Sequence, residues 1–128
     1  MAGCLVVDDA GRVLLLRRAI EPRLGYWTFP GGYVDLGETA AQAAIRETAE
    51  EVGMTVTLGE LIGVYFDLAS PKDAIVVYLA DPGRNPPTTS PEAAQVQYFA
   101  PDQISWDRIA FEPTRHCLND WIARAARG

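Results

Sequence analysis

Short apolar runs separated by polar turns dominate the chain, and this pattern is typical of β-strands. Five runs predict strands, with the third forming one long strand or two short ones: residues 4–7, 13–17, 55–68, 74–80 and 94–99. The turn sequence Asp8-Asp9-Ala10-Gly11 lies between the first two runs and predicts that they pair as a hairpin.

Proline and glycine mark the breaks between these runs. Residues 21–26 and the proline-rich residues 81–91 are predicted to be loops. Residues 27–34 are predicted to be short extended structure, interrupted by Pro30-Gly31-Gly32.

Two segments show helical spacing instead. The first is framed by Thr39 and Gln42, which can form a capping box, and by Gly53, a common C-terminal stop. At 100° per residue, one stripe of this helix is expected to face the core, and it consists of Ala41, Ala44, Ile45, Thr48 and Val52. Residues 111–126 predict a second helix.

Five acidic residues accompany the first helix. Asp35 and Glu38 lie in the preceding loop, and Glu47, Glu50 and Glu51 share one helical face. Close carboxylates raise each other's pKa unless a cation neutralises them, and their oxygens suit Mg²⁺ or Mn²⁺. A solvated acidic face would show the same spacing.

The glycines ahead of the helix favour a binding site. Gly31 and Gly32 allow a ligand to approach the backbone closely, so that a carbonyl or amide there can face a metal or a phosphate.

The complete spacing resembles the Nudix box. Gly32 is followed after five residues by Glu38 and after seven more by the sequence Arg46-Glu47-Thr48-Ala49-Glu50-Glu51-Val52-Gly53-Met54. Thr48 stands where the family usually has an aliphatic residue, and its hydroxyl can bond back to the Ala44 carbonyl. We therefore expect a small loss of stability there and no loss of chemistry.

The resemblance extends over nearly the whole chain. It implies an α/β Nudix fold, with a mixed β-sheet sandwiched between α-helices, in a single domain of residues 1–128. It also implies a divalent-metal-dependent hydrolase that cleaves a phosphoanhydride bond in a nucleoside diphosphate derivative, with Mg²⁺ or Mn²⁺ as the cofactor.

The resemblance also suggests roles for individual residues. The expected metal ligands are Gly31, Glu47, Glu50, Glu51 and Glu92. Glu92 precedes the last strand, where many relatives have an acid that binds metal or acts as the general base; an ordinary exposed loop glutamate is the alternative.

Catalysis is expected to use the same groups. Arg46 would orient a glutamate, Glu38 would support the site, and Glu92 or Glu47 would take a proton from water. His116, the only histidine, is given no catalytic role.

Residues 17–30 and Ile109-Ala110-Phe111 resemble a subgroup that includes FAD and ADP-ribose pyrophosphatases. The expected substrate-binding residues are Arg17, Arg18, Tyr26, Trp27 and Gly32. One of the two arginines should face the site and the other should face solvent, but the sequence does not indicate which arginine has which orientation. Either aromatic ring could stack on a base, although core packing is the more frequent role of an aromatic side chain.

Two other functions remain open. A sanitising nucleoside triphosphate pyrophosphohydrolase would share the box and differ in its base pocket. A non-catalytic nucleotide-sensing module would tend to lose the box glutamates, and here none is lost.

Charge and composition narrow the partners. A net charge of −6 argues against a broad basic face for nucleic acid or anionic membranes. No apolar run approaches the roughly 20 residues of a membrane span, and the N-terminus has no secretory pattern. Cys4 and Cys117 form no CxxC motif and are expected to be buried free thiols, with a disulfide left open. We expect a cytoplasmic protein with a small nucleotide substrate, and leave a homodimer open.

Overall fold

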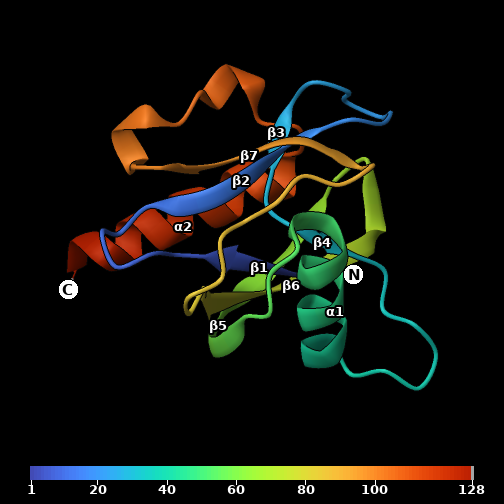
Figure 1. Cartoon of the computed structure of the whole chain (residues 1–128). Coiled ribbons are helices and arrows are strands. Elements are labelled where there is room, and N and C mark those ends of the chain that lie inside the picture. The colour runs from blue at the N-terminus through green and yellow to red at the C-terminus, as the bar shows by residue number, and fades with distance from the viewer. Residues whose placement is uncertain (128) are drawn as a thin grey trace.

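A computed structural model describes residues 1–127, apart from the side chains of residues 71 and 72. In chain order (Figure 1), its elements are β1 (Ala2–Val6), β2 (Val13–Arg18), β3 (Trp27–Thr28), β4 (Gly31–Gly32), α1 (Ala40–Val52), β5 (Thr57–Asp67), β6 (Ser70–Asp81), β7 (Ala93–Phe99), the 3₁₀ helices η1 (Pro101–Gln103) and η2 (Trp106–Arg108), and α2 (Glu112–Arg127).

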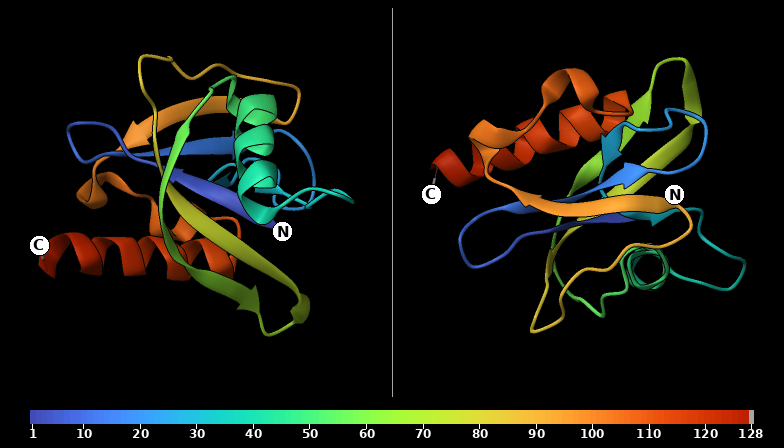
Figure 2. Two further views of the ribbon diagram at one scale, coloured as in Figure 1. Left: turned by 90° about the horizontal axis from the view of Figure 1, so that it is seen from below. Right: turned by 45° about the horizontal axis from the view of Figure 1, so that its top comes forward.

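The strands form two sheets. One has the order β4-β1-β6-β5 and is mixed, because β1 runs parallel to β6. The other has the order β3-β2-β7, and its pairs are antiparallel. The helices α1 and α2 lie on opposite sides of the strands (Figure 2). The expected mixed sheet between helices is confirmed, with the strands divided over two sheets.

The predicted hairpin of residues 4–7 and 13–17 is wrong. Strand β1 pairs with β4 and β6, whereas β2 pairs with β3 and β7, and only an isolated bridge joins Val7 to Val13. All five residues of β1 are buried, so its apolar pattern marks a central strand with two partners and does not specify which strands those are.

Successive residues of the central strands enter two cores. Leu5 and Leu15 pack with α2 in one core, whereas Cys4 and Leu16 pack with α1 in the other. This alternation follows from the two-residue period of a strand. Cys4 and Cys117 therefore lie in different cores as buried free thiols, and the expected thiol state is confirmed.

Helix α1 begins and ends as its sequence predicts. Thr39 and Gln42 form the capping box, and Gly53 adopts the left-handed conformation with φ 68°. The Thr48 hydroxyl donates to the Ala44 carbonyl at 2.7 Å.

The buried stripe of α1 differs from the predicted one. Ile45 is 36% exposed, whereas Ala43 and Glu51 are buried together with Ala44, Thr48 and Val52. The helix is rotated so that Glu51 faces the backbone of β4, where an amide hydrogen is available to its carboxylate.

Within residues 1–127, neither helix combines the length and the apolar character that a membrane crossing requires.

Candidate active site

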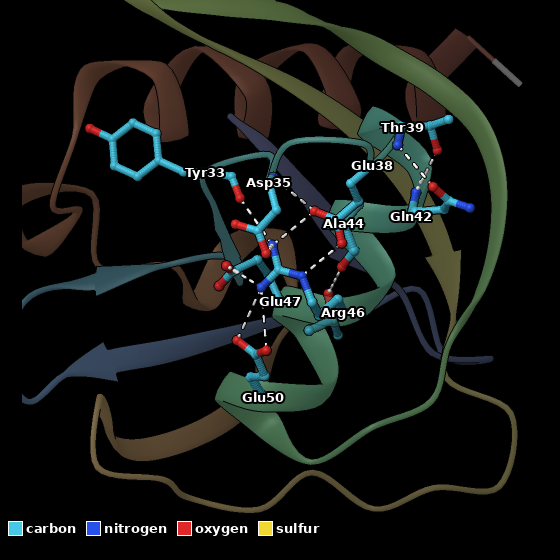
Figure 3. Close-up of polar contacts among 10 residues, drawn as sticks. Tyr33, Asp35, Glu38, Thr39, Gln42, Ala44, Arg46, Glu47 and Glu50 are labelled. Atoms are coloured by element: carbon cyan, nitrogen blue, oxygen red, sulfur yellow. Dashed lines mark hydrogen bonds and ion pairs between the residues drawn. The ribbon is translucent and has the colours of Figure 1, made fainter.

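Arg46 is the centre of the polar network on α1 (Figure 3). Its Nε and one terminal nitrogen donate to the two carboxylate oxygens of Glu38 at 2.7 and 3.0 Å. The other terminal nitrogen donates to Glu47 at 2.9 Å and to Glu50 at 3.2 Å. A further bond at 3.0 Å reaches the Tyr33 carbonyl and ties the β4–α1 loop to the helix.

These contacts stabilise the charged forms of both Arg46 and Glu38. Hydrogen bonds from Arg46 hold the pKa of Glu38 below its usual range. The same hydrogen bonds, which Glu38 and Glu47 accept, raise the pKa of the Arg46 guanidinium. The predicted orienting arginine therefore fixes two box glutamates in place.

Glu51 occupies the buried end of the acidic group. Its side chain accepts a hydrogen bond from the Gly31 amide at 2.7 Å, and the residue is only 8% exposed. Burial raises the pKa of Glu51 to about 8, and the charges of Glu47 and Glu92 act in the same direction. The Gly31 amide and the Arg18 guanidinium oppose this rise.

Glu47 lies directly against Gly32. A Cβ at Gly32 would come within 2.5 Å of the Glu47 carboxyl carbon, so any other residue at this position would displace the Glu47 side chain. Burial raises the pKa of Glu47, and nearby Glu50 and Glu92 add to the effect. The absence of a side chain at Gly32 therefore leaves room for the Glu47 carboxylate, a role that the sequence did not suggest for this glycine.

The chemistry of these donors suits a divalent cation. Glu47 and Glu51 belong to α1, and Glu92 lies in the turn just before β7. The charge of Glu92 raises the pKa of both Glu47 and Glu51. Such mutual repulsion is what a bound cation relieves. Among the described residues, however, no three acidic, histidine or cysteine side chains are arranged as a ready metal site. Glu47 and Glu50 turn toward Arg46, and Glu51 turns toward Gly31.

A cavity of about 490 Å³ opens beside Glu51. Its walls come from five separate parts of the chain, and its lining residues are Met1, Arg18, Pro22, Thr28, Phe29, Gly31, Tyr33, Glu51, Asp67, Ser70, Asp73, Ile75, Phe111, Pro113 and Thr114.

Arg18 is the arginine that reaches the cavity. Its guanidinium lies over the Phe111 ring at 5.1 Å, and its Nε donates to the Pro22 carbonyl at 2.7 Å. Arg17 is exposed, does not line the cavity, and donates to Gln95 on the neighbouring strand at 3.1 Å. The pairing register of β2 with β7 shifts between Arg17 and Arg18, at the point where the two side chains take different directions.

The structure does not bring Tyr26 and Trp27 to the cavity. The Trp27 ring packs edge-on against Phe99 with centroids 5.1 Å apart. The Tyr26 ring contacts the guanidinium groups of Arg23 and Arg108. These contacts favour packing roles for both rings.

Sequence reasoning missed most of the cavity wall. Phe111 falls in a segment that resembles the pyrophosphatase subgroup, so a signal for it existed. Asp67 ends β5, and Ser70 and Asp73 lie at the start of β6, where Ser70 donates to Asp73 at 2.7 Å. Nothing in their local pattern indicates that these strand ends return to Glu51.

Comparison with known proteins connects this geometry to a family. A protein-family model described as the NUDIX domain matches residues 1–122. A MutT-like protein of Streptomyces ambofaciens is 37% identical over 110 residues, which are 86% of this chain and 68% of that protein.

Two other relatives match over shorter stretches. An ADP-ribose pyrophosphatase of Methanocaldococcus jannaschii is 37% identical over 60 residues, or 47% of this chain and 36% of that protein. A putative 8-oxo-dGTP diphosphatase of Bacillus subtilis is 43% identical over 61 residues, or 48% of this chain and 39% of that protein. These two matches span well under half of each relative.

The fold is also found among solved structures. The crystal structure of a NUDIX hydrolase from Nitrosomonas europaea superimposes with a TM-score of 0.92 at 31% identity, covering 99% of this chain and 71% of that chain.

Proposed function

From the premise that this chain belongs to the NUDIX family and is a Nudix hydrolase, we propose that it cleaves a phosphoanhydride bond in a nucleoside diphosphate derivative. The observation that carries the proposal is the cavity of about 490 Å³ beside Glu51. Glu51 and Arg18 both line it, so a carboxylate suited to a divalent ion and a cation suited to a phosphate share one cavity.

We further propose Mg²⁺ or Mn²⁺ as the cofactor, held by Glu47, Glu50, Glu51, Glu92 and the backbone of Gly31. A bound divalent ion neutralises phosphate charge and lowers the pKa of a coordinated water. The mutual repulsion of Glu47, Glu51 and Glu92 supports this assignment.

The other residues act on substrate and water. Arg18 would donate to a phosphate oxygen, and Arg46 keeps Glu38 and Glu47 in fixed positions. Glu92 or Glu47 would accept the proton of the attacking water.

ADP-ribose and FAD are the favoured substrates. Arg18 and Phe111 belong to the segments that resemble the FAD and ADP-ribose pyrophosphatase subgroup, and these two side chains meet at the cavity. The likeness to the ADP-ribose pyrophosphatase of M. jannaschii supports the same choice.

A triphosphate pyrophosphohydrolase is the second candidate. The likeness to the putative 8-oxo-dGTP diphosphatase of B. subtilis favours it, since such an enzyme would use the same box with another base pocket. A non-catalytic sensing module ranks last, because the box glutamates are all present.

A hydrolysis screen with Mg²⁺ or Mn²⁺ tests the proposal. It should compare ADP-ribose, FAD, NADH, dinucleoside polyphosphates and triphosphates, each with and without excess chelator. We expect turnover of ADP-ribose or FAD that the chelator abolishes. Preference for a triphosphate with release of pyrophosphate would select the second candidate, and full turnover in chelator would rule out the metal.

A matched pair of variants completes the screen. Glu51→Gln should lower the rate by at least ~10²-fold, the scale of losing a key catalytic group. Glu60→Gln is the control, because Glu60 lies outside the cavity and pairs with Arg124 at 3.2 Å. A near-normal rate for Glu51→Gln would show that the ligand set is misassigned.

A further inference from the structure

Two buried threonine hydroxyls meet at the wall of the cavity. Thr28 on β3 is 7% exposed and Thr114 on α2 is 2% exposed, and both line the cavity. Their Oγ1 atoms are 2.8 Å apart, which is a hydrogen bond in which either can be the donor. The pair joins segments 86 residues apart in the sequence.

The bond between the two threonines leaves one hydroxyl hydrogen without an acceptor. Each hydroxyl has one hydrogen and two acceptor lone pairs, so the bond between them uses only one of two hydrogens. Neither hydroxyl has a further hydrogen-bond partner among the residues whose positions the structure describes. The second hydrogen is therefore a buried donor at the cavity wall, and buried donors are normally satisfied.

The surroundings of this donor suit an aromatic ring. Phe29 and Pro113 adjoin the two threonines in sequence, and together with Ile75 and Phe111 they line this part of the cavity with apolar surface; the polar lining residues Asp67, Ser70 and Asp73 come from β5 and β6. A sugar placed there would lose the hydration of several hydroxyls, whereas a nucleobase would bury its faces and need partners only at its edge.

We propose that the cavity binds the nucleobase of the substrate, and that the Thr28–Thr114 pair donates one hydrogen bond to an acceptor atom at the edge of that base. The proposal rests on the proposed function, because Arg18 and Glu51 at the same cavity place the phosphates next to it. Every natural base carries edge acceptors, so the pair recognises a base as such and needs other groups to choose among bases.

Removing both hydroxyls tests the pair. The variant Thr28→Val/Thr114→Val keeps the shape of both side chains and leaves no polar group without its partner, so the fold should tolerate it. Each single valine variant leaves one hydroxyl with its hydrogen free for the ligand. Thr48→Val is the matched control, since Thr48 is fully buried, bonds to Ala44, and does not line the cavity.

Binding should be measured by calorimetry on the Mg²⁺-loaded protein. Suitable probes are the α,β-methylene analogues of ADP, GDP, CDP and UDP and the corresponding ribose 5-diphosphate without a base, because a bridging carbon prevents hydrolysis. We expect the tightest nucleoside analogue to bind about tenfold more weakly to the double variant, on the scale of one lost hydrogen bond. The compound without a base should be unaffected, and the single variants and Thr48→Val should bind as the unmodified protein does.

The proposal would be overturned if the double variant bound the nucleoside analogue and the abasic compound with equally reduced affinity, or bound both as the unmodified protein does. It would also be overturned if the unmodified protein bound no nucleoside analogue more tightly than the abasic compound. A ligand-side test covers a double variant that does not fold: the analogue with phenyl in place of the base lacks edge acceptors and should bind the unmodified protein about tenfold more weakly. Equal binding of that analogue would also overturn it. Because these tests need no turnover, their failure is distinct from a failure of the hydrolysis screen.

Discussion

Among single residues, Arg46 connects the β4–α1 loop to the glutamates of α1. It bonds to the side chains of Glu38, Glu47 and Glu50 and to the Tyr33 carbonyl. A guanidinium supplies the five donors in a fixed plane that such a network needs, whereas an ammonium supplies three on a flexible stem. The network therefore depends on the shape of the arginine as well as on its charge.

This argument predicts that Arg46→Lys impairs catalysis although it conserves charge. We expect the turnover number to fall by roughly 10-fold to 10²-fold, because Glu47 loses its fixed position. Steady-state kinetics across a metal titration would measure the loss. Arg12→Lys is the control, since Arg12 forms a similar fork at 2.8 Å with Asp8 in a turn that does not line the cavity. Equal rates for both lysine variants would contradict the orienting role.

A second prediction distinguishes Glu92 from Glu47 as the general base. The Glu92 charge raises the pKa of Glu47, so Glu92→Gln should lower that pKa. If Glu47 is the base, the acidic limb of the pH–rate profile moves to lower pH and turnover persists. If Glu92 is the base, the turnover number falls far more than the Michaelis constant rises.

A metal titration tests a third role for Glu92, that of a metal ligand without a part in proton transfer. A residue that only binds metal gives a deficit that shrinks as the metal concentration rises. An unchanged rate and profile at every metal concentration would make Glu92 an ordinary loop glutamate.

At the scale of elements, α1 was predictable because its signals are local. Thr39 with Gln42 and Gly53 fix its ends within a few residues of sequence. Its rotation was not predictable, because it depends on the Gly31 amide, which the β1–β4 pairing places beside Glu51. The strand pairing of β1 and β2 failed for the same reason, since each has a long partner far away in sequence, β6 for β1 and β7 for β2.

The C-terminal end of α1 gives a prediction about stability. Gly53 and Gly37 both have positive φ, 68° and 83°, so alanine is strained at either position. A Cβ at Gly53 would also collide with the Thr88 hydroxyl, whereas a Cβ at Gly37 meets nothing within 4 Å. We expect Gly37→Ala to cost about 1 kcal/mol and Gly53→Ala to cost more, on the order of 2–3 kcal/mol.

Urea denaturation of both glycine variants would measure these free energies of unfolding. Comparable losses would show that Thr88 moves aside without cost and that only the backbone conformation matters at the end of α1.

At the scale of the molecule, the site is a product of assembly. The box residues could be located from the sequence because they occupy one continuous stretch of 23 residues, Gly32 to Met54. The cavity could not, because its wall is built from segments that are distant in sequence: residues 18–33, Glu51 on α1, the adjoining ends of β5 and β6, and residues 111–114. Local patterns carry no information on how such distant segments meet.

The buried acidic group also makes the stability of the whole molecule depend on pH and metal. The pKa of Glu51 is about 8 in the folded protein and 4.5 ordinarily, so between these values the folded state binds more protons than the unfolded state. Stability from protonated Glu51 is therefore complete below pH 4.5 and is lost as the pH rises through 8. The raised pKa of Glu47 acts in the same direction.

We therefore expect the protein in chelator to melt at a lower temperature at pH 8 than at pH 6, with a difference in unfolding free energy on the order of 1–3 kcal/mol. A divalent ion favours the ionised carboxylates, so Mg²⁺ should raise the melting temperature more at pH 8 than at pH 6. Glu51→Gln should show a smaller pH effect and a smaller Mg²⁺ effect, while Glu60→Gln should behave as the unmodified protein. Scanning calorimetry at the two pH values measures both effects. If the protein in chelator is equally stable at pH 6 and pH 8, the pKa of Glu51 is not raised by folding. If the Mg²⁺-induced rise in melting temperature is also independent of pH, Glu51 is not a carboxylate that the metal ion neutralises.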